Sequence, residues 1–364
     1  MAKLRHIKQL VKIVVVLTIV GCAGPMTPFG AYDIPQDQQS SKSLKNQTQT
    51  SSIPPSYINV YPEKLILHRP IDLRVVVNNP GGIDSEAQIN ITYNKKPIPK
   101  KYIKRSKKLI SKDGKTLNLI FKNIRFIPGK FNKLEVSYTR EDGQSFMKSV
   151  GPGHCSMYTA QDIKHWEHFK VPDEIKGLIK SISKKEKYGA SFLAALIAQE
   201  SSFNPKAVSW SKAIGLTQVT SIAEQEIFFK KKMRWPRYYR LNKLPVYFIK
   251  SYIKMGIINN HNEWRLNPKL SIEGGIRFLD YLNGYWSYRS NRKLLEKTFK
   301  NHAIPKEQII LASYNSGAYR VKKAIELYGK DWALDPKLVE AKKYYQNILS
   351  YCYTFEKSSE LAYE

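Results

Sequence analysis

Acidic residues are scarce in this chain, which has 30 Asp and Glu against 60 Lys and Arg among its 364 residues. The formal net charge of +30 predicts attraction to polyanions, namely nucleic acid, anionic lipid or an anionic cell-wall polymer. Cysteine is scarce too, with three residues in all. The sequence has no Cys-x-x-Cys or His-Glu-x-x-His spacing, and nothing near His165 and His168 completes a metal set. We therefore expect no metal site and no cofactor.

Long apolar runs are missing except near the N-terminus. Residues 13–20 form one apolar run that follows several basic residues, which is the layout of a secretory signal peptide. The run is too short to span a bilayer comfortably. It leads into Gly21-Cys22, which resembles the bacterial lipobox, where small residues precede a cysteine that becomes lipid-modified. A plain signal peptide with an incidental cysteine is the alternative.

These features predict a lipoprotein signal peptide at residues 1–21 and lipidation at Cys22. Export argues against nucleic acid as a partner and leaves cell-wall and membrane surfaces. Ala23 follows the cysteine, as in enterobacterial lipoproteins sorted to the outer membrane, so we expect an exported protein anchored by lipid on the periplasmic face of that membrane. In an oxidising compartment, Cys155 and Cys352 either form a disulfide or remain two buried thiols, and the sequence leaves both open.

Two segments of different character follow the predicted anchor. Residues 22–54 are rich in Pro, Gln, Ser and Thr, which predicts a flexible tether without a core. Residues 55–150 have apolar residues at every second position, separated by Gly- and Pro-containing turns, so we predict a small antiparallel β-sandwich of immunoglobulin-like type. Much of the basic charge lies in a predicted loop at residues 95–108. We interpret this loop as an anchor on an anionic polymer, with a solvated charge run as the alternative.

The period becomes helical after residue 151, which predicts an all-α domain at residues 155–356. Pro172 and Asp173 can open its first helix. In a later helix, Glu200 shares one face with apolar residues, and residues 201–205 stop that helix. Desolvation of such a carboxyl raises its pKa. Glu200 is therefore a candidate general acid, with a structural carboxylate as the alternative.

Four segments of this region resemble lytic transglycosylases of the soluble-transglycosylase type. Residues 200–218 are similar to the family motif E-S-x-F-N-P-x-A-x-S-x-x-G-A-x-G-L-M-Q, and residues 268–279 to P-x-x-N-I-x-x-G-x-x-Y-L. Residues 312–317 are similar to A-Y-N-x-G, and Glu340 and Tyr344 to the family's E-T-x-x-Y segment. The four segments stand in the family's order. The leader, the tether and the β-domain lie outside the resemblance.

The resemblance implies a lysozyme-like α-fold and peptidoglycan glycan strands as the substrate. In this family, one glutamate protonates the glycosidic oxygen between N-acetylmuramic acid and N-acetylglucosamine and then takes a proton from the C6 hydroxyl that attacks C1, leaving a 1,6-anhydro end. The resemblance implies this role for Glu200, without the second carboxylate that most glycosidases use. Tyr314 would place its phenol near the reacting centre.

The resemblance also implies four residues that bind or organise the substrate site. Ser209 would hold the N-acetyl carbonyl, and Gln218 would contact the sugar from the far side of the cleft. Asn315 would hydrogen-bond the loop. Glu340 would organise the cleft floor, with a fold-stabilising ion pair as the alternative.

The sequence departs from the family pattern at several positions. Lys212 stands where the family usually has Gly, Thr217 and Thr220 replace two methionines, and Ser271 replaces Asn. None of these changes removes the acid, so we expect activity with altered subsite preference. Residues 228–240 add aromatic and basic side chains, which either contact the glycan or pack as an aromatic cluster covered by basic residues.

Two other functions remain open at this stage. A muramidase of the goose-type lysozyme kind would use water and would need a further acid to activate it. A non-catalytic wall-binding lipoprotein would not need the acid, and the intact Glu200, Ser209, Gln218 and Tyr314 argue against this reading.

Overall fold

The computed structural model describes residues 55–83, 88–128, 132–153, 156–158, 163–231, 234–300 and 302–357. All of them belong to the second of two units, Ser52–Glu364. The predicted signal peptide, Cys22, the whole predicted tether and Cys155 lie outside the described residues. Within the described residues, no helix has the length and apolar character needed to cross a membrane.

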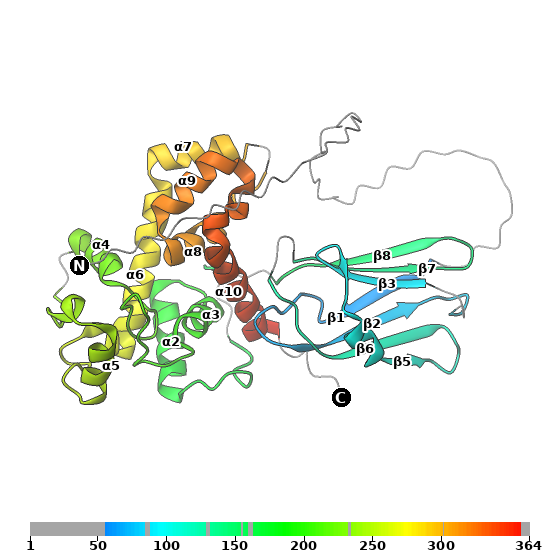
Figure 1. Ribbon diagram of the computed structural model, residues 1–364, viewed down its shortest axis with the longest axis horizontal. Helices are drawn as coiled ribbons and strands as arrows, with labels where there is room; N and C mark the ends of the chain where they lie inside the picture. The colour runs from blue at the N-terminus through cyan, green and yellow to red at the C-terminus, as the bar shows by residue number, and fades with distance from the viewer. Residues whose placement is uncertain are drawn as a thin grey trace, which may run out of the picture. The chain divides into compact units, whose positions relative to one another are not determined.

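The N-terminal part of this unit contains two antiparallel four-stranded sheets (Figure 1). The first sheet has the order β1 (Tyr57–Tyr61), β2 (Ile71–Asn78), β6 (Thr116–Ile124) and β5 (Lys107–Ile110). The second has the order β4 (Lys96–Pro97), β3 (Gln88–Tyr93), β7 (Leu134–Thr139) and β8 (Ser145–Val150). The predicted antiparallel β-region is thus confirmed.

Alternate residues of the strands fill one core between the sheets. Leu73, Val75 and Val77 of β2 are fully buried, and so are Leu134 and Val136 of β7. Successive side chains of a strand point to opposite faces, so this pattern places one face of each strand inside. The apolar period of the sequence therefore identified the strands that line the core.

The prediction that residues 95–108 form a basic loop is wrong. It contains β4, the short helix α1 (Lys100–Lys104) and the start of β5. Helix α1 has no buried residue, and all four residues of β5 are exposed. Without a buried face these elements carry no apolar period, which is why the sequence pattern missed them.

The C-terminal part is helical, as predicted. Its longer elements are α2 (Asp173–Glu186), α3 (Ala190–Ser201), α4 (Ser221–Lys231), α5 (Val246–Lys254), α6 (Pro268–Ser287), α7 (Arg289–Thr298), α8 (Lys306–Ser316), α9 (Ala318–Tyr328) and α10 (Val339–Lys357). Helix α3 lies at the centre, against α2 and α10 (Figure 1). Nearly all of its residues are buried, and the two that are only partly buried, Gln199 and Glu200, lie in its last turn.

The starts and ends of these helices follow local chemistry. Pro172 precedes α2, where a residue without an N–H costs no helical hydrogen bond. Helix α3 ends because Ser202 and Phe203 adopt left-handed φ angles of 49° and 63°, which no α-helix continues. The chain turns there into the loop that leads to Gln218, and this loop forms one wall of the candidate site.

The β-region packs on helix α10 through hydrogen bonds and a stacked pair of rings. The Leu67 N–H donates to Ser350 Oγ at 2.8 Å, and His68 Nδ1 lies 2.8 Å from the same oxygen. The His68 ring stacks on Tyr351 with centroids 4.1 Å apart. Burial lowers the pKa of His68 to about 3, so this histidine is neutral at ordinary pH.

Candidate active site

Glu200 lies in the last turn of α3, where the helix emerges from the core. Its neighbours Leu196 and Ile197 are fully buried, whereas Glu200 itself is only partly buried. Tyr344 of α10 donates its phenol hydrogen to Glu200 Oε1. Burial raises the pKa of Glu200 to about 8, although the Tyr344 hydrogen bond acts in the opposite direction. The carboxyl therefore keeps its proton at neutral pH, which is the form a general acid needs.

Tyr314 of α8 stands beside this carboxyl. Its phenol donates to the Thr217 carbonyl at 2.8 Å, and its ring stacks on Tyr344 with centroids 6.4 Å apart and an interplanar angle of 12°. Burial and the charge of Glu200 raise the pKa of Tyr314 well above its ordinary value. Two protonated phenols from different helices thus flank the one carboxyl.

The loop after α3 is braced by its own polar side chains. The Ser209 N–H donates to the Ala213 carbonyl, and the Ala213 N–H donates back to Ser209 Oγ, both at 3.0 Å. Gln218 adopts a φ of 48° and is buried. Its Nε2 donates to the Gly215 carbonyl at 2.8 Å and to the Ala207 carbonyl at 3.1 Å. The amide of Gln218 therefore closes the base of the loop.

The loop keeps its backbone shape at the position where Lys212 replaces glycine. Lys212 adopts a φ of 60°, in the left-handed region that favours glycine. Its Nζ donates to the Asn242 carbonyl at 2.9 Å. Position 215, unlike position 212, has no room for a side chain, because an added Cβ on Gly215 would lie 1.8 Å from the Arg265 carbonyl oxygen.

Two other departures from the family pattern contact each other. Thr217 and Ser271 are both 1% exposed, and Thr217 Oγ1 donates to the Ser271 carbonyl at 2.6 Å. This bond fastens the loop to the first turn of α6, next to the carbonyl that accepts from Tyr314. Thr220 precedes α4, and its Oγ1 accepts from the Ala223 N–H at 3.2 Å, as a helix-capping residue does.

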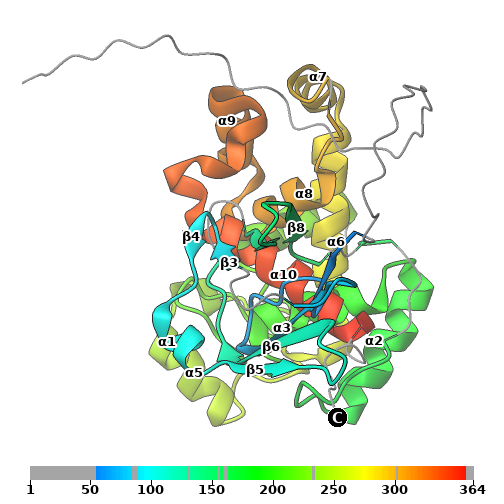
Figure 2. The same ribbon diagram turned by 90° about the vertical axis from the view of Figure 1, so that its right-hand side faces the viewer.

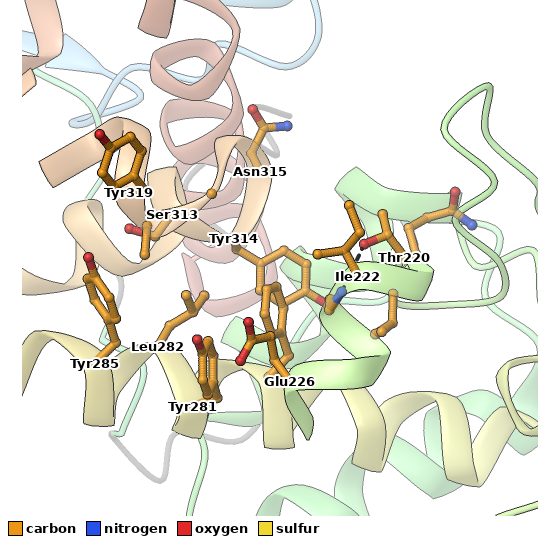
Figure 3. Close-up of a pocket in the computed structure, with 16 residues that line it drawn as sticks. Thr220, Ile222, Glu226, Tyr281, Leu282, Tyr285, Ser313, Tyr314, Asn315 and Tyr319 are labelled. Carbon is orange, nitrogen blue, oxygen red and sulfur yellow. Dashed lines mark hydrogen bonds between the residues drawn. The ribbon is translucent and has the colours of Figure 1, made fainter. Parts of the chain in front are cut away.

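A pocket of about 420 Å³ opens between α4, α6, α8 and the start of α9 (Figure 3). Gln218, Tyr314 and Asn315 are among its lining residues. Figure 3 shows Tyr281, Tyr285 and Tyr319 on one side and Thr220 and Ile222 on the other, with the Glu226 carboxylate beside Tyr281. Aromatic faces with a few polar groups suit a sugar ring.

The segment that contains Glu200, Ser209 and Gln218 matches a known family. Residues 177–242 match the family model described as Transglycosylase SLT domain. This match covers 66 of the 364 residues of the chain. No curated protein sequence matches the chain at a significant level.

Two solved structures are similar to this chain. One is an inactive mutant of the lytic transglycosylase Slt from Pseudomonas aeruginosa, with 17% identity, a TM-score of 0.35, and coverage of 55% of this chain and 27% of that one. The other is the 70 kDa soluble lytic transglycosylase from Escherichia coli, with 18% identity, a TM-score of 0.33, and coverage of 51% and 25%. The chain spans about a quarter of the length of either structure.

The two remaining predicted residues, Asn315 and Glu340, lie outside the matched segment. Asn315 is exposed near the end of α8 and lines the pocket. Glu340 is exposed in the first turn of α10, where an acidic residue is favourable to the helix dipole. Its predicted role at the cleft floor stays a prediction. Tyr344, one turn further along, is the residue that reaches Glu200, and only its place in the last motif pointed to it.

The aromatic and basic segment at residues 228–240 packs inward at the positions that the structure describes. Phe228, Trp235 and Trp264 form one cluster, with the two tryptophan rings 5.0 Å apart. The Arg237 guanidinium lies 4.9 Å from the centroid of the Phe228 ring, and that of Arg277 lies 5.5 Å from the Trp235 ring. This favours the packed cluster over glycan contact for Phe228 and Trp235.

One further site feature concerns cysteine. Cys352 of α10 is fully buried and disulfide-bonded. Both other cysteines of the chain lie outside the described residues. Of the two states that the sequence left open for Cys352, the free thiol is therefore wrong.

Proposed function

We propose that this protein is a peptidoglycan lytic transglycosylase. It cleaves the β-1,4 bond between N-acetylmuramic acid and N-acetylglucosamine and leaves 1,6-anhydromuramic acid ends. The observation that carries the proposal is the Glu200 carboxyl, which is protonated at neutral pH and accepts from the Tyr344 phenol in a segment that matches the SLT domain model. A neutral carboxyl at a cleft is suited to protonate a leaving glycosidic oxygen.

The reaction proceeds in two steps through Glu200. Glu200 first gives its proton to the glycosidic oxygen as the bond to C1 breaks, while the substrate's own N-acetyl oxygen stabilises the positive charge at C1. The C6 hydroxyl then forms a bond to C1 and loses its proton to the ionised Glu200, which restores the acid. The phenol of Tyr344, which donates to Glu200, stabilises the carboxylate between the two steps, and Tyr314 places its phenol near the reacting centre.

The other predicted residues have supporting roles in this proposal. The Ser209 hydroxyl, half-buried on the braced loop, holds the N-acetyl carbonyl. Gln218 keeps the loop closed through its Nε2 atom and presents its remaining amide oxygen to the sugar. Asn315 hydrogen-bonds the loop, and Glu340 organises the cleft floor. No cofactor takes part.

Mass spectrometry of digested peptidoglycan tests the proposal. We expect products with 1,6-anhydro ends from the native chain and none from Glu200→Gln. Glu174→Gln, which changes an exposed acid of α2, serves as the matched control and should cleave normally. Unchanged digestion by Glu200→Gln would mean that a non-catalytic, wall-binding role or another acid must be considered.

A hydrolytic muramidase is the second candidate, and one observation favours it. Glu226 lines the same pocket as Tyr314, so a second carboxylate is present that water activation requires. Its side chain forms a hydrogen bond with Tyr281. Hydrolysis leaves reducing ends in place of anhydro ends, so the same mass spectra separate the two functions.

We also propose an exported protein that is anchored by lipid at Cys22 on the periplasmic face of the outer membrane. The basic residues, short apolar run and lipobox-like sequence support this. A Cys22→Ser chain should lose the mass of the acyl groups and leave the membrane fraction.

The β-region is proposed to be an immunoglobulin-like sandwich. Its strand orders β1-β2-β6-β5 and β4-β3-β7-β8 correspond to A-B-E-D and to C-F-G with one added edge strand. Such a sandwich is suited to position the helical domain on a surface.

A further inference from the structure

A second pocket, of about 670 Å³, opens in the β-region, away from the residues assigned to catalysis. Its floor is apolar, since Ile98, Ile124 and Phe126 line it and are at most 4% exposed. Tyr93 and Tyr102 add aromatic walls. A concave apolar surface of this size is large enough for part of an organic ligand.

The rim of this pocket is cationic. Lys96, Lys101 and Arg125 line it and are exposed, and within the described part of the chain none of the three has an acidic partner. Residues 88–112 contain nine Lys and Arg and no Asp or Glu. Figure 2 shows α1, which contributes Lys101, near β5 and β6. The ligand that complements this rim is an anion.

Large aliphatic side chains stand exposed among these cations. Ile127 lines the pocket and is 68% exposed, and Ile103 of α1 is 52% exposed. A polar wall polymer would leave both side chains and the apolar floor in water. An amphiphile with a phosphate group covers them, since its charged group meets the cations and its glycerol and acyl parts meet the isoleucines.

We propose that this pocket and its rim dock the β-region onto an anionic phospholipid surface. The phosphate lies among Lys96, Lys101 and Arg125, and Ile103 and Ile127 enter the boundary between headgroups and acyl chains. The proposal does not depend on the enzymatic activity or on a lipid at Cys22. Docking would fix the height of the helical region above the membrane.

Vesicle sedimentation tests the proposal with the chain from Ser52 onward, which forms one compact unit and lacks the predicted anchor. We expect it to sediment with vesicles of phosphatidylglycerol and phosphatidylcholine and not with phosphatidylcholine alone. The variant Lys96→Gln/Lys101→Gln/Arg125→Gln should bind about 100-fold more weakly, since each basic residue near an anionic surface contributes about fivefold.

Two further variants separate this surface from general charge. The control Lys293→Gln/Lys297→Gln/Lys330→Gln removes three exposed cations of the helical domain and should lose less than about threefold in affinity. Ile127→Ser should weaken binding about tenfold without changing its salt dependence, because it removes apolar contact and no charge.

Three results would overturn the proposal. Equal losses in the two triple variants would mean that net charge alone drives binding. Equal sedimentation with neutral vesicles would remove the role of the anion. Sedimentation with purified peptidoglycan sacculi but not with anionic vesicles would identify a wall polymer as the occupant. Activity of each variant on soluble glycan strands, measured in parallel, reports whether the SLT domain is still folded.

Discussion

Replacing Glu200 by glutamine should remove the activity and, at neutral pH, stabilise the fold. The pKa of Glu200 is raised from its ordinary value of 4.5 to about 8 by burial. Between these two pH values the folded protein keeps the Glu200 proton that the unfolded chain releases. The resulting loss of folding stability is absent below pH 4.5 and grows as the pH rises toward 8. A neutral glutamine of similar shape has no such penalty and still accepts from Tyr344.

The size of the effect follows from the titration. At pH 7, about 2.5 units above the ordinary pKa of 4.5, the Glu200 carboxyl keeps its proton in the folded protein and loses it in the unfolded chain. This difference destabilises the folded state by about 3 kcal/mol. Water that reaches this partly buried carboxyl reduces the gain, so we treat this as the upper bound. We expect Glu200→Gln to raise the free energy of unfolding by about 1–3 kcal/mol at pH 7 and by less than about 0.5 kcal/mol at pH 4.5.

Urea unfolding of the native and Glu200→Gln chains at both pH values measures the difference. Glu174→Gln, an exposed acid of α2, is the control and should show none. The activity of the native chain should also fall as the pH rises through about 8, where Glu200 loses its proton. Equal unfolding free energies for native and Glu200→Gln chains at pH 7 would refute the raised pKa and, with it, the assignment of Glu200 as the neutral acid.

Three other changes test separate parts of the structure. Tyr344→Phe removes the hydrogen bond that lowers the pKa of Glu200, so the alkaline limit of the pH–activity profile should move upward while kcat falls. Lys212→Gly should raise the free energy of unfolding by about 1 kcal/mol in urea titrations, because glycine adopts the positive φ without strain. The pKa of His68 is lowered by burial to about 3, so the unfolded chain binds a proton that the folded protein excludes, and stability should fall as the pH drops from about 6.5. Urea unfolding at pH 7 and 5 should show a smaller loss for His68→Gln than for the native chain.

The sequence predicted the elements that have a buried face and missed those that have none. The period-two residues of β2 and β7 face one core, and the helical period located α2 and the helix α3 that carries Glu200. By contrast, all four residues of β5 are exposed, so burial imposes no apolar pattern on its sequence. A segment without a buried face is held in place by its neighbours, and its own residues do not reveal it.

The sequence predicted individual residues of the candidate site but not the contacts between them. The motifs pointed to Glu200 and Tyr314, and the loop motif to Gln218. They could not predict that the Nε2 of Gln218 is used within the loop, or that Tyr344 donates to the acid. The Gln218 contacts depend on the exact backbone path of the loop, and the Tyr344 contact joins residues 144 positions apart that only the packing of α3 against α10 brings together.

The two departures at Thr217 and Ser271 illustrate the same point from the opposite direction. Read singly, each replaces a family residue and weakens the resemblance. In the folded chain they bond to each other, and the carbonyl of Thr217 is the acceptor for Tyr314. The pair therefore fixes the carbonyl that positions the Tyr314 phenol. A site of this kind is maintained by the contacts around the carboxyl, and different side chains can supply them.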